Sequence, residues 1–184
     1  SGDTHFVSRE YSEAVRNYQQ AFSMKVYDAD YSLYQMAYCS GLQRNEAGKI
    51  SQLRSLVTSF PQSPYVDDAH YELGRSYERE GKFSDAKREY QAIIDKYRES
   101  TYYPKALLQM GLVNYNLSEY QNALKYYKQV AENYGGTQEA QAALMGIKNC
   151  YVEMNNVDAY FAYANTLGSG SVVTTSEQDS LTYY

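Results

Sequence analysis

The feature that most constrains the fold of this chain is a repeat of 35 to 37 residues. One column of small residues contains Gly2, Ala37, Gly74, Gly111 and Gly146, at steps of 35, 37, 37 and 35. Two further columns follow it, a small one at Ala14, Ala86 and Ala123 and a larger one at Tyr18, Leu53, Tyr90 and Tyr127. Periods of this length are typical of solenoids, in which each repeat buries its apolar face only against its neighbours.

The clearest segment runs from Tyr65 to Tyr134, and its first unit indicates what each repeat folds into. Apolar residues recur at steps of three and four on both sides of Gly81, which predicts two amphipathic helices joined by a tight turn. A glycine within the first of these helices, Gly74, predicts a close approach by the partner helix, because glycine weakens a helix by about 1 kcal/mol relative to alanine. The predicted fold class is therefore all-α, a right-handed α-solenoid of antiparallel helix pairs.

Polar residues predict where several helices begin. Ser63, Ser100 and Thr137 recur at steps of 37, and each is expected to cap the new helix that follows it. Ser118 is expected to cap the second helix of its repeat. The pattern drifts in the last repeat, where we expect the second helix to shift by one residue around Ala159.

The predicted organisation is an array over 1–168, a linker over 169–175 and the first turns of a further helix over 176–184. Within the array we expect a partial repeat at 1–26, repeats at 30–63, 67–100 and 104–137, and a divergent repeat at 139–168. Neither end resembles the polar cap of a finished array, so further repeats are expected at both ends. The Ser1–Gly2 start is either native or a cloning remnant, and both readings stay open.

Composition excludes several functional classes. The net charge is −5, and lysine and arginine are interspersed with aspartate and glutamate, whereas a nucleic-acid binder would usually carry a basic stripe. No run approaches the roughly 20 apolar residues that a membrane span requires. The chain also carries 23 tyrosines and no tryptophan, which suits the half-buried packing positions of a solenoid.

Residues capable of chemistry are few and scattered. His5 and His70 have no second histidine or cysteine at ligand spacing, and Cys39 and Cys150 have no histidine base nearby and lie too far apart in the array for a disulfide. The acidic pair at 67–68 is expected at a helix N-terminus. We therefore expect no metal, no cofactor and no catalytic activity.

The repeat columns resemble the tetratricopeptide repeat. That family favours a small residue, then alanine, then an aromatic residue at fixed positions, and this chain places Gly74, Ala86 and Tyr90 there, then Gly111, Ala123 and Tyr127. The family's proline near the end of the repeat is matched by Pro61, whereas its leading tryptophan is missing. The 37-residue step and the linkers further resemble repeats of Gram-negative envelope proteins, such as the periplasmic Tol–Pal coordinator and an outer-membrane assembly lipoprotein.

The resemblance implies that a concave groove is lined by set positions of each first helix. Those that we expect to bind a partner are Tyr31, Tyr34, Tyr38, Tyr71, Arg75, Glu78, Arg79, Leu112 and Tyr115. In the last repeat the same positions would be Ala140, Ala143, Ile147, Cys150 and Tyr151. Tyrosine and arginine are enriched at interface hot spots, so this groove suits a protein or peptide.

The leading hypothesis is a non-catalytic scaffold that binds a partner polypeptide along its groove. By resemblance it would lie in the periplasm or at the outer membrane, with the cytoplasm as the alternative. A second hypothesis is a glycan- or peptidoglycan-binding module that stacks sugars on the groove tyrosines. A third is a structural spacer or self-association segment of a larger repeat protein.

Overall fold

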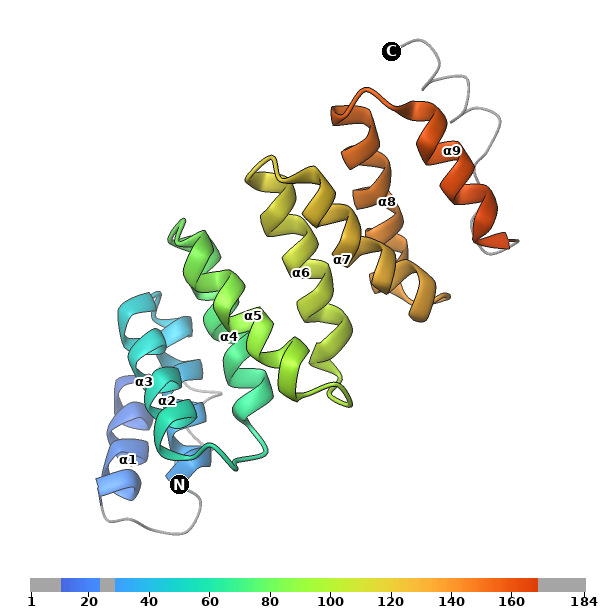
Figure 1. Cartoon of the computed structure of the whole chain (residues 1–184). Coiled ribbons are helices and arrows are strands. Elements are labelled where there is room, and N and C mark those ends of the chain that lie inside the picture. The colour runs from blue at the N-terminus through green and yellow to red at the C-terminus, as the bar shows by residue number, and fades with distance from the viewer. Residues whose placement is uncertain (1–10, 24–28, 169–184) are drawn as a thin grey trace. The chain divides into compact units, whose positions relative to one another are not determined.

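The computed structural model describes residues 11–23 and 29–168 of the 184-residue chain, and within these ranges it is all-helical (Figure 1). The helices are α1 (Tyr11–Ser23), α2 (Ala29–Leu42), α3 (Glu46–Ser59), α4 (Val66–Arg79), α5 (Phe83–Lys96), α6 (Tyr102–Asn116), α7 (Tyr120–Asn133), α8 (Gln138–Glu153) and α9 (Val157–Thr166). The all-α fold class is thus confirmed. Across the described ranges, none of these helices combines the length and the apolar character needed to cross a bilayer.

The chain divides into two compact units, residues 1–102 and 103–184, and each is described by itself. In the first unit, α2 pairs with α3 and α4 with α5, and α1 packs on α2. In the second unit, α7 packs against α8, and α9 also packs on α8. The predicted linker at 169–175 and further helix at 176–184 lie outside the described residues.

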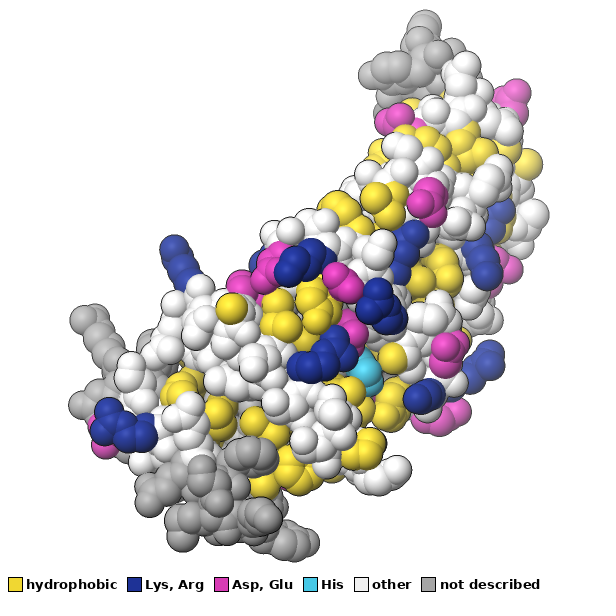
Figure 2. Space-filling view, turned by 60° about the vertical axis from the view of Figure 1, so that its left-hand side comes forward, with side chains coloured by type: hydrophobic (Ala, Val, Ile, Leu, Met, Phe, Trp, Pro, Cys, Tyr) yellow, Lys and Arg dark blue, Asp and Glu magenta, His cyan; other side chains and the backbone are white. Residues whose placement is uncertain are grey.

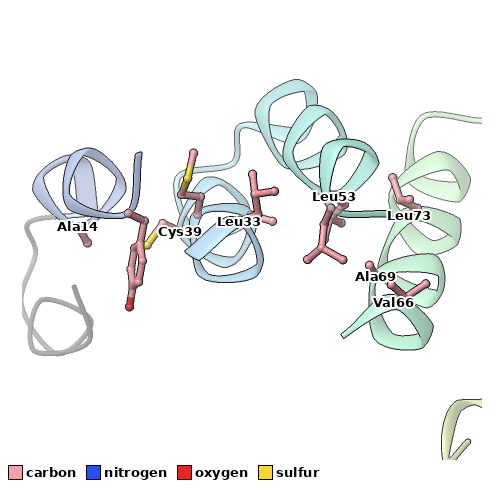
Figure 3. Packing of buried hydrophobic residues seen from close by; sticks show 11 residues of the cluster. Ala14, Leu33, Cys39, Leu53, Val66, Ala69 and Leu73 are labelled. Atoms are coloured by element: carbon pink, nitrogen blue, oxygen red, sulfur yellow. The ribbon is translucent and has the colours of Figure 1, made fainter. Parts of the chain in front are cut away.

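The core of the first unit is a thin apolar layer that runs from helix to helix (Figure 3). Ala14 of α1 and Cys39 of α2 lie at one end of this layer, and Leu73 of α4 lies at the other. Leu33 and Leu53 fill the space between them, each at most 3% exposed. Each helix therefore buries its apolar face against its neighbours, as the repeat period predicts.

The helical glycines are explained by tyrosine rings. A Cβ atom on Gly74 would lie 2.4 Å from Cε1 of Tyr90, and one on Gly111 would lie 2.5 Å from Cε1 of Tyr127. The predicted close approach is therefore confirmed, and the group that approaches is the aromatic side chain of the partner helix. Tyr127 also lies against Gly146 of α8, so one ring occupies the space left by two missing side chains.

The turn of each hairpin contains one residue with a positive φ, although the residue type at that position differs between repeats. Gly81 has a φ of +73°, and Arg44, Ser118 and Asn155 have φ values of 58°, 61° and 56°. These four positions are 37 residues apart, so each hairpin turns through a left-handed residue, although only one of them is glycine. The prediction that Ser118 caps the following helix is wrong, because Ser118 forms the left-handed turn and α7 begins after Glu119.

Two of the three predicted caps of first helices have another role. Thr137 caps α8 as predicted, since its hydroxyl accepts a hydrogen bond from the Ala140 amide at 3.1 Å. Ser63 and Ser100 instead lie ahead of their helices, and each accepts a hydrogen bond from the amide two residues later. Their hydroxyls donate to Asp30 of α2 at 2.6 Å and to Asp67 of α4 at 2.5 Å, so each serine ties the segment ahead of one first helix to the start of the preceding first helix.

The last repeat keeps its register. The predicted shift around Ala159 is wrong, because α9 begins at Val157, 37 residues after α7 begins at Tyr120. In the second helix of this repeat, the position that holds alanine in the two preceding repeats holds tyrosine, and the position that holds tyrosine there holds alanine. Tyr160 and Ala164, both buried, stand where Ala123 and Tyr127 stand in the preceding repeat.

Candidate functional site

The first unit contains an open pocket of about 440 Å³ between α2, α3 and α4. Its walls are Tyr34, Ala37, Tyr38, Gly41 and Leu42 of α2, Glu46, Lys49 and Leu53 of α3, Asp68, Glu72 and Arg79 of α4, and Tyr102. Its volume falls within the range of small-ligand pockets. Tyr38 and Leu42 are 54% and 44% exposed, so apolar surface is available at this site.

Two ion pairs tie α3 to α4 along this pocket. Lys49 Nζ donates to Glu72 Oε2 at 2.8 Å, and Arg79 Nε donates to Glu46 Oε1 at 2.8 Å. The Lys49 side chain is only 12% exposed, and Glu72 supplies the negative charge that compensates its ammonium group. Burial alone would raise the pKa of Glu46, but the hydrogen bonds from Arg79 and Ser76, together with the charges of Arg79 and Lys49, hold that pKa below its usual value.

A third carboxylate in the pocket has only phenols as partners. Asp68 accepts hydrogen bonds from the hydroxyls of Tyr34 and Tyr102. Burial, reinforced by the charges of Glu72 and Asp67, raises the pKa of Asp68 despite these hydrogen bonds. Burial, followed by the contact with Asp68, also raises the pKa of each of the two tyrosines well above its ordinary value.

Aromatic rings fix the shape of this wall. Tyr34 stacks on Tyr65, with centroids 5.0 Å apart and planes inclined by 17°. Tyr71 and Tyr102 are the equivalents of Tyr34 and Tyr65 in the next repeat, 37 positions later, and their ring centroids lie 5.2 Å apart. The ring face that Tyr34 turns toward Tyr65 is therefore covered.

The predicted groove residues of the first unit fall into two groups. Tyr34, Tyr38 and Arg79 line the pocket together. Tyr31 lies beside it, half-buried and 5.8 Å from the Tyr65 ring, while Tyr71 contacts the pocket residue Tyr102.

The remaining two predicted residues of α4 do not line the pocket. Arg75 Nη1 lies 3.8 Å from Glu78 Oε2, and Glu78 accepts a hydrogen bond from the hydroxyl of Tyr90. Burial raises the pKa of Glu78, although the hydrogen bond from Tyr90 and the charge of Arg75 oppose the rise. Glu78 thus serves mainly to satisfy a buried tyrosine of its own hairpin.

Leu112 and Tyr115 lie on α6, in the second unit. Leu112 is 37% exposed, and Tyr115 lies 5.6 Å from the Tyr120 ring. Lys105 at the start of α6 donates to Glu139 of α8 at 3.0 Å, which joins these two helices. Met145 of α8 is 55% exposed on its own helix.

The groove prediction for the last repeat is wrong. The residues predicted there, which are Ala140, Ala143, Ile147, Cys150 and Tyr151, are all buried in the core. The error arose because Gly146 was taken as the equivalent of Gly111, although the 37-residue step leads to Lys148. Counting by 37 moves the set by two residues, to Ala142, Met145, Asn149, Val152 and Glu153, none of which is buried.

Several pocket residues escaped prediction because they come from elements outside the expected face. Lys49 and Glu46 belong to a second helix, and Tyr102 begins the following repeat. One signal was present in the sequence, since Lys49 occupies the column that holds Ala86 and Ala123 in later repeats. The long side chain of this lysine passes beside Gly41 of α2, where an added Cβ would lie 3.4 Å from Lys49 Cδ.

One contact between successive repeats changes its chemistry along the chain. Tyr31 contacts Tyr65 through their rings, Asp68 contacts Tyr102 through a hydrogen bond, and Lys105 contacts Glu139 through an ion pair. The first residues of these pairs are 37 positions apart, as are the second. Depending on the repeat, this contact thus has no charged side chain, one charged side chain, or two side chains of opposite charge that neutralise each other.

A separate buried network joins α3, α4 and α5. Glu89 is 4% exposed, accepts a hydrogen bond from Arg54 Nη2 at 2.7 Å, and lies 3.0 Å from His70 Nδ1. Arg54 also donates to the Tyr77 hydroxyl at 3.1 Å. Burial alone would raise the pKa of Glu89, but the hydrogen bonds from His70 and Arg54 lower it below its usual value.

No group of three or more potential metal ligands occurs among the described histidine, cysteine, aspartate and glutamate side chains. Cys39 and Cys150 are each buried and free, and burial raises the pKa of the Cys150 thiol to about 11. A thiol with so high a pKa is a poor nucleophile at neutral pH.

Family models now add to this geometry. Two models, both described as tetratricopeptide repeat, match residues 31–63 and 71–138. The chain contains tetratricopeptide repeats. Proteins built from tetratricopeptide repeats are generally non-catalytic scaffolds that mediate protein–protein interaction.

Solved structures show the same fold. The crystal structure of MamA protein is similar with a TM-score of 0.74 at 19% identity, covering 92% of this chain and 87% of that one. BtubC from P. vanneervenii reaches a TM-score of 0.71 at 9% identity, over 100% of this chain and 79% of that one. A tetratricopeptide repeat protein from Parabacteroides merdae reaches 0.62 at 15% identity, over 94% of this chain and 64% of that one.

These likenesses confirm the α-solenoid fold of the tetratricopeptide repeat and extend no further than the fold. A search of curated proteins finds no match to this chain.

Proposed function

We propose that this chain is a non-catalytic scaffold that binds a segment of a partner polypeptide through the pocket of its first unit. The observation that carries the proposal is the pocket itself, where exposed Tyr38 and Leu42 border paired charges on α3 and α4. Apolar anchors beside fixed polar groups suit a peptide, because the apolar surface supplies affinity and the polar groups set orientation.

The charge pattern on one face of the molecule supports a protein partner over a nucleic acid. On the face drawn in Figure 2, lysine and arginine side chains lie interspersed with aspartate and glutamate around apolar patches. Such mixed charge suits the polar rim of a protein interface. A sugar that stacks on the face of Tyr34 turned toward Tyr65 is disfavoured, because the Tyr65 ring already covers that face.

The test is a selection of peptides from a random displayed library on the whole chain, followed by affinity measurements on variants. We expect Tyr38→Ala and Leu42→Ala to weaken the selected peptides by about tenfold or more, as central interface residues do. Leu117→Ala is the matched control, since Leu117 is 38% exposed but lies in the second unit.

Equal binding by wild type, Tyr38→Ala and Leu42→Ala would move the partner site away from this pocket. Heat released on titration with peptidoglycan oligosaccharides would instead favour the glycan hypothesis. A molecular mass that rises with concentration in sedimentation would favour self-association.

A location in the cell envelope is part of the same proposal and rests on the resemblance of the linkers and of the repeat length. Fractionation of the source cells with an antibody against this chain tests it. Recovery with cytoplasmic proteins would overturn the envelope location and leave the binding proposal standing.

A further inference from the structure

The charges of the pocket in the first unit do not balance. Of its three carboxylates, Glu46 is paired with Arg79 and Glu72 is paired with Lys49, each at 2.8 Å. The third, Asp68, forms no ion pair with any lysine or arginine of the described chain. Its hydrogen bonds come from two neutral phenols, which orient the carboxylate but leave its charge uncompensated.

The repeat architecture shows how unusual this arrangement is. At the equivalent place in the second unit, Lys105 is neutralised by Glu139 at 3.0 Å. At the equivalent place one repeat earlier, Tyr31 and Tyr65 carry no charge. Asp68 is thus the member of this series whose charge has no counterpart.

The walls around Asp68 suit a cation. Tyr34 and Tyr102 bind the carboxylate itself, and Tyr38 extends from α2 with 54% of its surface exposed. Phenol rings attract ammonium and guanidinium groups through their electron-rich faces, by about 0.5–1 kcal/mol at exposed sites. The chain as a whole has a net charge of −5, which attracts basic segments over longer distances.

We propose that the pocket between α2, α3 and α4 binds a cationic side chain, lysine or arginine, of the partner polypeptide, with Asp68 as its counter-charge. The inference rests on the proposed function and specifies its partner as a basic segment. An ammonium or guanidinium group entering the pocket supplies the charge that Asp68 lacks, while the aliphatic part of the side chain packs against Tyr38 and Leu42.

The experiment is a titration of the isotope-labelled whole chain, followed by amide NMR spectra. The probes are N-acetyl-arginine methylamide and N-acetyl-lysine methylamide, with the citrulline analogue as the uncharged isostere of arginine. We expect saturable shifts within residues 34–42 and 66–72 for the two cations, and binding of citrulline weaker by about tenfold.

The chain offers a matched pair of variants. Asp68→Asn keeps the shape and the acceptor for Tyr34 but removes the charge, so the affinity for the arginine probe should fall about tenfold. Asp67→Asn removes the same charge one residue away, where the side chain accepts from Ser100 at 2.5 Å and does not line the pocket. The control variant should bind the arginine probe like wild type.

The inference is overturned if Asp68→Asn binds the arginine probe as wild type does, or if citrulline binds as well as arginine. Selected peptides that occupy the pocket without any basic residue would also overturn it, while the proposal that the pocket binds a partner polypeptide would stand. Conversely, arginine binding that depends on Asp68, without any selected peptide, would support the cation site and remove the polypeptide-binding proposal. The amide spectra themselves show whether each variant is folded.

Discussion

At the scale of single residues, the helices of this chain pack through pairs in which a tyrosine ring on one helix lies against a glycine on another. Gly74 and Tyr90 form such a pair, and Tyr90 is fully buried. Because interiors are close-packed, a methyl group added to the glycine has nowhere to go unless the ring moves.

We expect Gly74→Ala to destabilise the chain by about 1–3 kcal/mol, even though alanine is the better helix former. Urea unfolding monitored by circular dichroism measures this. Gly135→Ala is the control, because nothing lies within 4 Å of the Cβ it would add.

Ala37 with Leu53 occupies the same positions one repeat earlier, so Gly74→Ala combined with Tyr90→Leu should recover part of the loss. A double variant no more stable than Gly74→Ala would contradict the pairing.

The left-handed turn residues lead to a second prediction. Ser118 has a φ of 61° without being glycine, and such a residue costs roughly 1 kcal/mol. Ser118→Gly should therefore raise the free energy of unfolding by about 0.5–1 kcal/mol, and Gly81→Ser should lower it by a similar amount. The measurement is the thermal midpoint, which should rise in Ser118→Gly and fall in Gly81→Ser. Shifts in the same direction would contradict the shared turn geometry.

Asp68 links stability to binding. Its pKa is raised, first by burial and then by the charges of Glu72 and Asp67, while Tyr34 and Tyr102 donate hydrogen bonds to it. The ionised form is therefore less favourable in the folded state, and Asp68→Asn should stabilise the free chain at neutral pH. The gain should stay below about 1 kcal/mol, because Asp68 is only partly buried and water screens its charge.

Because the folded pKa lies above the unfolded value of 3.8, this gain should vanish as the pH falls toward that value. Urea unfolding of wild type and Asp68→Asn at both pH values measures the difference. A gain that persists in acid would assign it to packing and not to charge.

At the scale of helices, the network around Glu89 fastens three elements together. Arg54 of α3 and His70 of α4 both contact this carboxylate of α5, which is 4% exposed. Removing one partner of a buried ion pair leaves the other without compensation.

We expect Glu89→Ala to cost about 1–3 kcal/mol of unfolding free energy, because the buried acceptor is lost while Arg54, 43% exposed, can still reach water. Glu99→Ala, which changes an exposed glutamate of the following turn, should cost less than about 0.5 kcal/mol. Similar losses in the two variants, measured by urea unfolding, would mean that the network contributes little.

The helices also show what the sequence could and could not predict. The period of three and four residues around Gly81 located α4 and α5, because these helices are amphipathic and bounded by a turn glycine. The last repeat was misread because its glycine, Gly146, faces Tyr127 of the preceding hairpin and not its own partner helix. A column of small residues does not reveal which neighbour fills the space.

The pocket was predictable only in part, for a similar reason. Tyr34, Tyr38 and Arg79 followed from their positions on first helices, whereas Glu46, Lys49 and Tyr102 belong to other elements. That Asp68 lacks a cation depends on which partners Lys49 and Arg79 choose, which the sequence does not show. The pairing of charges is a property of the folded structure.

At the scale of the whole molecule, two sets of described carboxylates oppose each other: the pKa values of Asp68 and Glu78 are raised, chiefly by burial, and those of three glutamates are lowered. The pKa values of Glu46, Glu89 and Glu139 are lowered, the last chiefly by its hydrogen bond from Lys105. These groups stabilise the fold above the unfolded value of 4.5, and that contribution is lost as the pH falls through their folded pKa values.

Wild type should therefore lose stability below about pH 4.5. Glu89→Gln should be less stable at neutral pH but lose less on acidification, because it no longer has this proton to take up. Thermal midpoints measured between neutral pH and about pH 3 test the slope. An identical slope in the variant would show that the acid sensitivity resides in other groups.

The hydrogen bonds from tyrosine to carboxylate have a consequence for spectroscopy. The chain has 23 tyrosines and no tryptophan, so its intrinsic ultraviolet fluorescence comes from phenols alone. Tyr34, Tyr90 and Tyr163 each donate to a carboxylate, an arrangement that quenches phenol emission. Unfolding breaks these bonds and should make the chain brighter, so emission reports the loss of the folded state without any added dye.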